Sequence, residues 1–172
     1  MGHCGAVRGL LGAGADPLVQ EAANGWNALH LAAALGQHDI LRILLQESPG
    51  VDPDTRSGDP ASPTALHLAV APPHLRGGSW PGCVAALLEA GASTEFMAVG
   101  SWMTPLHAAA ARGDCDVLRA LLAAGADVAK VDAGGQNALH FSCRVVCLPA
   151  VQMLLRAGAD EAARDHRGLT SA

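Results

Sequence analysis

Aromatic side chains, lysine and net positive charge are all scarce in this sequence, and the shortage of positive charge bears on the partners that it can bind. Aromatic residues make up 3% of the 172 residues, Tyr is absent, and Lys130 is the single lysine among 11 basic residues. The formal net charge is −5, so the chain lacks the basic surface on which nucleic-acid binding depends. We therefore expect no nucleic-acid partner.

Disulfide, zinc and membrane signatures are missing as well. The five cysteines are an odd number and include no Cys-x-x-Cys pair, so neither a disulfide scaffold nor a zinc module is predicted. A reducing compartment, either cytoplasmic or nuclear, is expected. No apolar run reaches the roughly 20 residues that a membrane-spanning helix needs, so no membrane association is expected.

Two short motifs recur in step along the chain. The first motif has four positions: Thr or Asn, then Ala or Pro, then Leu, and finally His. It occupies residues 27–30, 64–67, 104–107 and 137–140. Its histidines, at 30, 67, 107 and 140, are 37, 40 and 33 residues apart. The second motif is Leu-Leu, two residues and Gly-Ala, and it occupies residues 10–15, 87–92, 121–126 and 154–159. This self-similarity indicates a repeat protein.

Each part of the repeat has a physical role. The Thr or Asn is an N-cap whose side-chain oxygen accepts from free backbone amides, and Pro105 takes the first helical position, where its missing N–H has no consequence. A short Ala-rich helix and a turn follow. A second helix then carries apolar residues at helical spacing, as at 117–122, and a Gly in the left-handed conformation ends it. The pattern predicts a pair of helices in each repeat.

These motifs resemble the ankyrin-repeat family, whose pattern is Thr-Pro-Leu-His, Ala-Ala, Gly-His, Val-Val, Leu-Leu and Gly-Ala-Asp. The resemblance covers essentially the whole chain. It implies an all-α solenoid of antiparallel helix-turn-helix units with hairpin loops that project sideways. It also implies a binding surface formed by the hairpin tips and the first helices. The motif histidines are implied to hydrogen-bond to backbone between neighbouring repeats.

The motifs divide residues 1–172 into one ankyrin-repeat domain. We expect a partial repeat at 1–23, repeats at about 24–60, 61–100, 101–133 and 134–166, and a stub at 167–172. Because both ends match interrupted repeats, we expect a fragment of a longer array. The pattern is lengthened at 48–50 and 59–63 and interrupted by a Pro- and Gly-rich insert at 72–81, which is expected to be an exposed loop. Val146 and Pro149 replace the usual turn, which leaves the pairing of the last two helices open.

No catalytic residue, metal ligand set or cofactor is predicted. The Gly-rich stretch 9–14 lacks the Gly-Lys-Ser/Thr ending of a phosphate loop, and the histidines outside the motif are far apart in sequence. Cys143 and Cys147 are four residues apart and can share a helix face. They fit either a two-thiolate site or two small buried apolar residues.

The aromatic residues are the informative departure from the repeat pattern. Trp26, Trp80, Phe96 and Trp102 fall in predicted loops, and residues 96–103 form a hairpin without a charge. Exposed apolar clusters mark interfaces, and Trp is enriched among residues that dominate binding. The alternative is that these side chains fold back onto a neighbouring hairpin. The predicted protein-binding residues are Trp26, Phe96, Met97, Trp102 and Met103, flanked by Arg112 and Phe141.

The sequence therefore predicts a monomeric protein-interaction module that binds a partner protein and is not an enzyme. An alternative is the regulatory or targeting segment of a larger enzyme or ubiquitin-ligase adaptor, whose catalytic or adaptor domain lies outside this chain. A structural spacer is the third hypothesis.

Overall fold

Short helices account for the regular structure of this chain. The computed structural model describes residues 2–48, 50–58, 62–71 and 80–171, and within these ranges the only β-pairing is an isolated bridge between Arg56 and Thr64. The helices are α1 (Gly2–Gly12), α2 (Ala28–Ala34), α3 (His38–Glu47), α4 (Ala65–Val70), α5 (Pro81–Glu89), α6 (Pro105–Arg112), α7 (Cys115–Ala123), α8 (Ala138–Arg144) and α9 (Leu148–Arg156).

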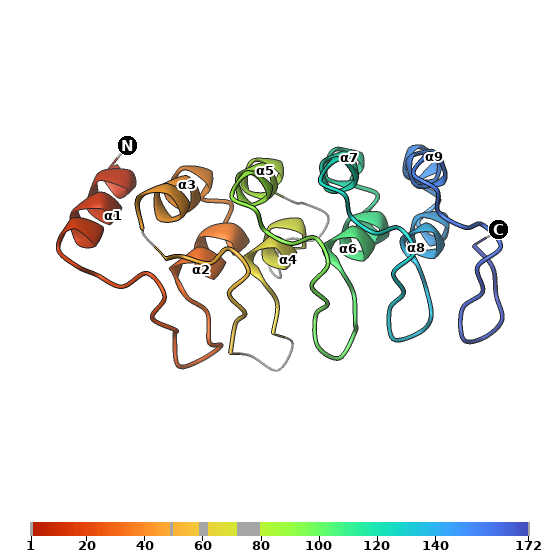
Figure 1. The fold of residues 1–172 in the computed structure, drawn as a ribbon, viewed down its shortest axis with the longest axis horizontal. Coiled ribbons are helices and arrows are strands. Elements are labelled where there is room, and N and C mark those ends of the chain that lie inside the picture. Colours follow the sequence, from red (N-terminus) through yellow and green to blue (C-terminus); the bar gives the residue numbers. More distant parts are fainter. Residues whose placement is uncertain (1, 49, 59–61, 72–79, 172) are drawn as a thin grey trace.

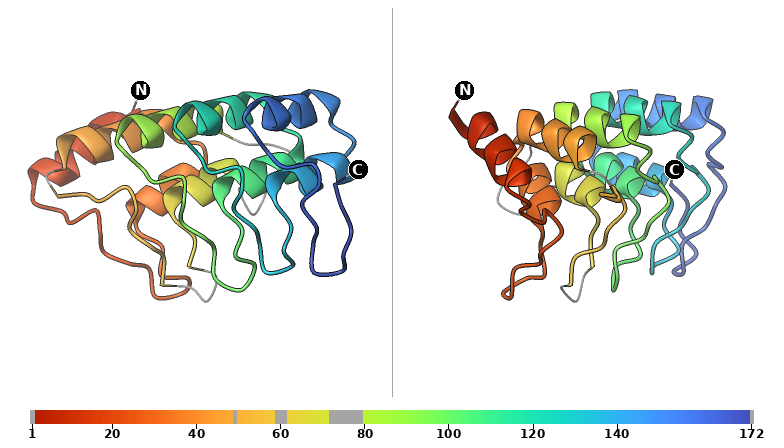
Figure 2. Two further views of the ribbon diagram at one scale, coloured as in Figure 1. Left: turned by 45° about the vertical axis from the view of Figure 1, so that its right-hand side comes forward. Right: turned by 60° about the vertical axis from the view of Figure 1, so that its left-hand side comes forward.

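The helices stack in two parallel rows (Figure 1). The outer helices α1, α3, α5, α7 and α9 form one row, and the inner helices α2, α4, α6 and α8 form the other. We number the connecting segments as hairpins 1 to 5, at residues 13–27, 48–64, 90–104, 124–137 and 157–171. Each follows an outer helix, and hairpins 1 to 4 lead to the next inner helix. All of them project from the same side of the stack (Figure 2). The all-α solenoid expected from the sequence is confirmed.

The inner helices begin at the cap residues that the motif predicts. Asn27, Thr64, Thr104 and Asn137 are the N-caps of α2, α4, α6 and α8. At α6, the backbone N–H of His107 donates to Thr104 Oγ1 (3.5 Å), and the N–H of Thr104 donates to His107 Nδ1 (3.1 Å). Cap and histidine thus satisfy each other's backbone donors at the start of the helix, as in a capping box.

The core consists of small and branched apolar residues. Ala33, Ala69 and Ala109, one on each of three inner helices, are completely buried, and the motif leucines beside the histidines are equally inaccessible. Because alanine adds only a methyl group, neighbouring inner helices approach closely and the leucines fill the space between the rows. One contiguous cluster therefore runs from α2 to α9.

Motif histidines of three repeats contact the hairpin of the following repeat. The Nε2 atoms lie 3.2 Å from the Met103 carbonyl oxygen for His67, 3.0 Å from that of Lys130 for His107 and 3.3 Å from that of Leu169 for His140. The backbone contacts implied by the resemblance are confirmed for these three histidines. At His107, Nε2 faces carbonyl oxygens and Nδ1 accepts from Thr104, so the ring binds as a neutral imidazole protonated at Nε2.

Burial makes this arrangement sensitive to acid. Removal of the ring from water lowers the pKa of His67 to about 4, against an opposing hydrogen bond to the Met103 carbonyl, and burial lowers the pKa of His107 as well. As pH falls below about 6.5, the unfolded chain binds a proton at His67 and the folded chain does not. Stability is therefore lost between pH 6.5 and pH 4 and changes little from this source below pH 4.

We expect His67→Gln to remove this dependence. The difference in unfolding free energy between wild type and variant should shrink by about 3 kcal/mol from pH 7.5 to pH 4, because only the wild type loses the contribution of the buried imidazole. Urea titrations at several pH values measure it. Leu68→Ala is the control, since it destabilises the same helix with no titrating group and should give a constant difference. A constant difference for His67→Gln as well would contradict the prediction.

The last helix pair forms in spite of its altered turn. Helices α8 and α9 pack against each other, and Pro149 occupies the first turn of α9. Val146 adopts φ 55° at the place where the other turns have Gly36 (φ 68°) and Gly113 (φ 67°). Its side chain is 86% exposed. A β-branched residue in the left-handed region is strained, and here no burial offsets the strain.

We expect Val146→Gly to stabilise the fold by about 1 kcal/mol, as relief of about 2 kcal/mol of strain exceeds the entropy that glycine loses on folding. Thermal and chemical denaturation measure the change. Val145→Gly is the matched control, because Val145 has φ −89° and no strain to relieve. It should lower the free energy of unfolding. Destabilisation of similar size by both variants would show that Val146 is not strained.

Trp80 has a structural role that the sequence did not indicate. Its indole N–H donates to the Ala34 carbonyl oxygen (2.9 Å), and its ring lies against Gly36, where a Cβ atom would be 2.4 Å from the indole. Trp80 therefore packs onto the end of α2 and is not part of an exposed loop. Pro81, the last residue of the predicted insert, begins α5 and is not part of a loop. Residues 72–79 of the insert and the predicted lengthening at 49 and 59–61 lie outside the described residues.

Candidate functional site

Hairpin 3, residues 90–104, presents an aromatic side chain in an unfavourable backbone conformation. Trp102 has φ 57° and lies two residues before the cap of α6. Gly25, Gly135 and Gly168 occupy the corresponding place in hairpins 1, 4 and 5, with φ 66°, 76° and 78°. The Trp102 side chain is nevertheless 58% exposed. It therefore combines backbone strain with little burial, and such outliers cluster at functional positions.

A groove runs from Trp102 towards hairpin 4. It has a volume of about 650 Å³. Met97 and Trp102 form one wall, and Ala129 and Val131 belong to the other. The remaining lining residues are Asp127, Lys130, Asp132, Ala133 and His166. This combination of exposed apolar and charged side chains is compatible with a protein-binding surface.

A second groove runs from Trp102 towards hairpin 2. It has a volume of about 360 Å³, and its lining is mostly apolar, with Arg56 and Glu95 as its charged residues. The Arg56 guanidinium donates to the Met97 carbonyl oxygen (2.6 Å) and lies 5.5 Å above the centre of the Phe96 ring. Phe96 is therefore half-buried under a residue of the neighbouring hairpin, whereas Trp102 stands between the two grooves.

Glu95 connects hairpin 3 to hairpin 4 at the base of the two hairpins. Its Oε1 accepts from the backbone N–H of Asp127 (3.0 Å), and its Oε2 lies 3.9 Å from Lys130 Nζ. The backbone N–H of Ala133 also donates to the Ser101 carbonyl oxygen (3.1 Å). Hairpins 3 and 4 are thus joined at both their base and their tip, which holds the apolar groove open between fixed walls.

The structure brings together only some of the residues predicted from the sequence. Phe96, Met97 and Trp102 line the two grooves, whereas the side chain of Met103 packs against the core. Trp26 is half-buried against the core on hairpin 1, and hairpin 2 separates it from hairpin 3 (Figure 1).

The two predicted flanking residues lie away from the exposed surface of hairpin 3. Arg112 is half-buried in the last turn of α6, about 10 Å along the helix from the hairpin end. Phe141 is 4% exposed, packs edge-on against His107 with the ring centres 5.7 Å apart, and is covered by the Arg144 guanidinium at 4.5 Å. Phe141 is therefore a core residue between repeats, and Arg144 presents the surface at that place.

Sequence reasoning missed two exposed apolar residues beside this site. Val99 is 53% exposed on hairpin 3, and Val131 is 44% exposed on hairpin 4. Val131 was detectable: it lies six residues after Gly125, as Met97 lies six residues after Gly91, so the two are equivalent in successive repeats. Arg56 was not detectable, because nothing in its local sequence indicates a contact 41 residues away.

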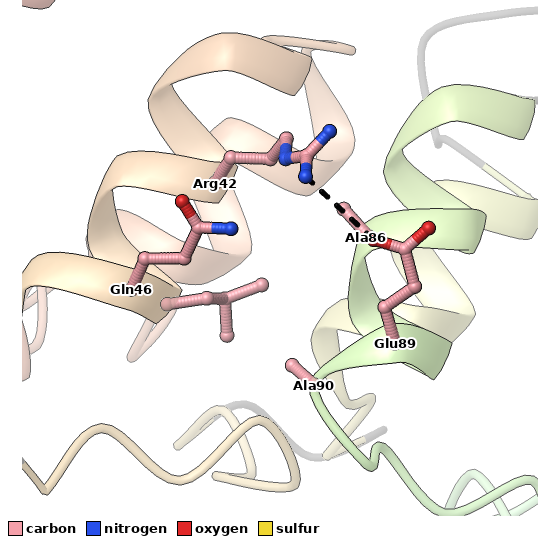
Figure 3. A pocket seen from close by; sticks show the side chains of 6 residues that line it. Arg42, Gln46, Ala86, Glu89 and Ala90 are labelled. Atoms are coloured by element: carbon pink, nitrogen blue, oxygen red, sulfur yellow. Dashed lines mark ion pairs between the residues drawn. The ribbon is translucent and has the colours of Figure 1, made fainter.

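Two further surfaces are polar. A small groove between α3 and α5 is crossed by Arg42, whose guanidinium lies 3.8 Å from the Glu89 carboxylate (Figure 3).

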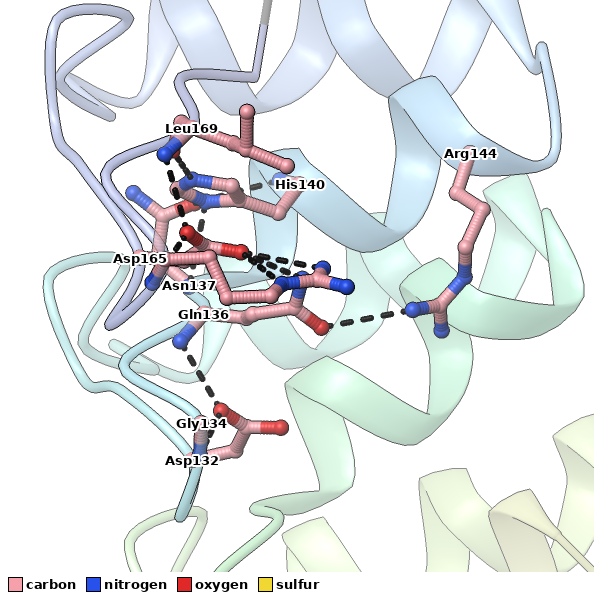
Figure 4. Close-up of polar contacts among 9 residues, drawn as sticks. Asp132, Gly134, Gln136, Asn137, His140, Arg144, Asp165 and Leu169 are labelled. Carbon is pink, nitrogen blue, oxygen red and sulfur yellow. Dashed lines mark hydrogen bonds and ion pairs between the residues drawn. The ribbon is translucent and has the colours of Figure 1, made fainter.

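In hairpin 5, Asp165 accepts from the N–H groups of Leu169 (3.0 Å) and Arg167 (2.9 Å) (Figure 4). These bonds, that of Leu169 foremost, lower the pKa of Asp165 to about 2. Asp165 therefore acts as the structural anchor of its hairpin.

Neither grouped metal ligands nor a membrane-spanning helix is found in the described part of the chain. No three His, Cys, Asp or Glu residues there are close enough to share a metal ion. No helix there combines the length and apolar character that a bilayer requires.

Comparison with known proteins identifies the family. The family model described as "Ankyrin repeats (3 copies)" matches residues 1–95 and 77–165. The crystal structure of the ankyrin repeat domain of Bcl-3 superposes with a TM-score of 0.85 at 32% identity, over 98% of this chain and 71% of that one. The chain therefore belongs to the ankyrin-repeat family, and ankyrin repeats are in general protein-interaction modules.

Particular relatives carry the same repeats within longer proteins. Human ankyrin repeat and SOCS box protein 16 is 35% identical over 96% of this chain and 36% of its own length. The mouse B-cell lymphoma 3 protein homolog is 32% identical over 90% of this chain and 33% of its own length. The chain thus spans about a third of the length of these curated relatives.

We expect Arg56→Ala to loosen hairpin 3. Loss of a charge-assisted hydrogen bond to Met97 and of the contact with Phe96 should speed amide exchange at Ala98 and Trp102 about tenfold. Hydrogen–deuterium exchange measures these two amides, which hairpin 3 protects through its own backbone bonds. Arg119→Ala is the control, because Arg119 pairs with Asp116 of its own helix. Unchanged exchange in Arg56→Ala would mean that hairpin 3 is ordered without the neighbouring hairpin.

Proposed function

We propose that this chain is a docking module that binds a partner protein through the tips of hairpins 3 and 4, with Trp102 as the central contact. The observation that carries the proposal is the exposed indole at a left-handed position, where hairpins 1, 4 and 5 have Gly and hairpin 2 has Ser62 (φ 45°). Gly would adopt this backbone without strain and the indole is largely exposed, so packing alone does not explain the residue.

The surroundings of Trp102 support this proposal. The indole lies between two grooves, and Met97 contributes to both. Val99 and Val131 extend the apolar surface, while Lys130 and Asp132 supply charges at its edge. Because the hairpins are already joined to one another, the surface loses little conformational entropy on binding. The inner helices, which are the first helices of the repeats, lie beside this surface and form the rest of the docking face.

The names of several relatives favour a second, more specific role. Human ankyrin repeat and SOCS box protein 18 is 38% identical over 83% of this chain, and an Arabidopsis protein named E3 ubiquitin-protein ligase KEG is 33% identical over 69%. We propose as the alternative that the docking face recruits a protein to a ubiquitin-ligase adaptor. Sequencing the transcript on both sides of this region tests it, because the alternative requires a SOCS-box or ligase segment there.

We expect Trp102→Gly to separate binding from folding. Loss of a central Trp should weaken partner binding by about 2–4 kcal/mol, which is at least a 30-fold loss of affinity. The same change should not lower stability, since Gly tolerates the left-handed backbone that Trp strains. Affinity capture from cells that express the protein, followed by titration of the captured partner, measures binding. Thermal denaturation measures stability.

Val19→Ala is the control variant, since Val19 is an exposed apolar residue on hairpin 1. A partner that binds wild type and Val19→Ala but not Trp102→Gly supports the proposed site. Equal binding to all three would move the site away from hairpin 3. Capture of no partner by a folded wild-type protein would contradict the docking role and favour a spacer.

A further inference from the structure

Two thiols from successive repeats meet at the outer side of the stack. Cys115 is the first residue of α7, and Cys147 is the residue that precedes α9. Their Sγ atoms are 3.9 Å apart although the residues are separated by 32 positions in the chain. Both side chains are partly exposed, so small reagents in solution can reach them.

Both thiols of this pair lie near the same backbone carbonyl group. The thiols of Cys115 and Cys147 both point at the Gly113 carbonyl oxygen, at 3.7 and 3.6 Å. Gly113 also provides the room, because a Cβ atom there would lie 3.3 Å from both Cβ and Sγ of Cys147. The turn between α6 and α7 therefore holds one thiol from its own repeat and one from the next.

The pairing differs from the one that the sequence suggested. Cys143 and Cys147 were candidates for a shared site because they are four residues apart. Instead, Cys143 lies on α8 and Cys147 lies at the turn beyond it, where the neighbouring repeat supplies Cys115. Stacking of equivalent turns brings Cys115 and Cys147 together, and this proximity is invisible in the local sequence.

We propose that Cys115 and Cys147 form a disulfide on exposure to a small disulfide such as oxidised glutathione, and that this bond links the outer helices α7 and α9. One thiolate attacks a glutathione sulfur, which forms a mixed disulfide and releases one reduced glutathione. The second thiolate then attacks the protein sulfur of the mixed disulfide and releases the other. Two thiol protons are lost, and two electrons pass from the protein to glutathione.

Bond formation requires the Sγ atoms to approach from 3.9 Å to about 2 Å, through rotation about the Cα–Cβ bonds and an approach of the two turns. Partial burial and then the hydrogen bond to Cys147 raise the pKa of Cys115, so exchange is slow at neutral pH and calls for long equilibration. The resulting bond would restrict separation of the last two repeats.

The test equilibrates the folded protein in glutathione buffers of increasing oxidised fraction and maps disulfides by mass spectrometry of unreduced peptides. We expect loss of the mass of two hydrogen atoms without retained glutathione, a cross-linked peptide pair that contains Cys115 and Cys147, and a melting temperature several degrees above that of the reduced protein. A stable mixed disulfide on a single cysteine, or a cross-link between another pair, would overturn the proposal.

Two cysteine variants test whether the cross-link depends on the proposed pair and not on a folding defect. Cys115→Ser should abolish the cross-link and the rise in melting temperature, whereas Cys143→Ser should retain both, because Cys143 is not part of the pair. Circular dichroism checks that both variants remain helical. Loss of the cross-link in a folded Cys143→Ser protein would assign the reaction to the pair suggested by the sequence and contradict the proposal.

Discussion

The imidazole of the repeated motif is the interaction on which the rest of this structure depends. One ring nitrogen meets the cap of its own inner helix, and at His67, His107 and His140 the other meets a carbonyl oxygen of the following hairpin. A single side chain thereby starts a helix and sets the position of the next repeat. Repetition of this contact holds the hairpins in a row, and that row creates the grooves beside Trp102.

Hairpin 3 departs from the repeat pattern at Trp102, which strains the backbone and which we propose as a binding residue. The other hairpins use Gly or polar residues before the cap, whereas Trp102 adopts the same backbone conformation at a cost in strain. Its indole remains 58% exposed. Arg56 of hairpin 2 donates to hairpin 3, and Glu95 of hairpin 3 accepts from hairpin 4, so the hairpin with the strained residue is held between its two neighbours. Local strain supported by a rigid frame is typical of sites that serve binding.

The last repeat shows a different departure, in which two unusual residues are adjacent. Val146 is strained at a turn, and the next residue, Cys147, reaches back to the turn of the preceding repeat. In the other turns the equivalent glycines relieve strain or make room for a neighbour. The substitutions in this repeat therefore change how it contacts the preceding one, while the capping and core residues that define the repeat are retained.

The sequence by itself determined the helices, their caps and their order, because these depend on local spacing: a Thr or Asn cap, a motif histidine, apolar residues at helical intervals and a terminating glycine. It also placed Trp102 and Met97 on a projecting hairpin. Only the tertiary structure decided which side chains are exposed and which side chains of different repeats meet. Phe141 is buried behind Arg144, Trp80 packs against Gly36, and Cys147 meets Cys115 and not a residue of its own repeat. These outcomes depend on contacts between residues one repeat or more apart, and no local pattern of residues specifies which side chains stacking will bring together.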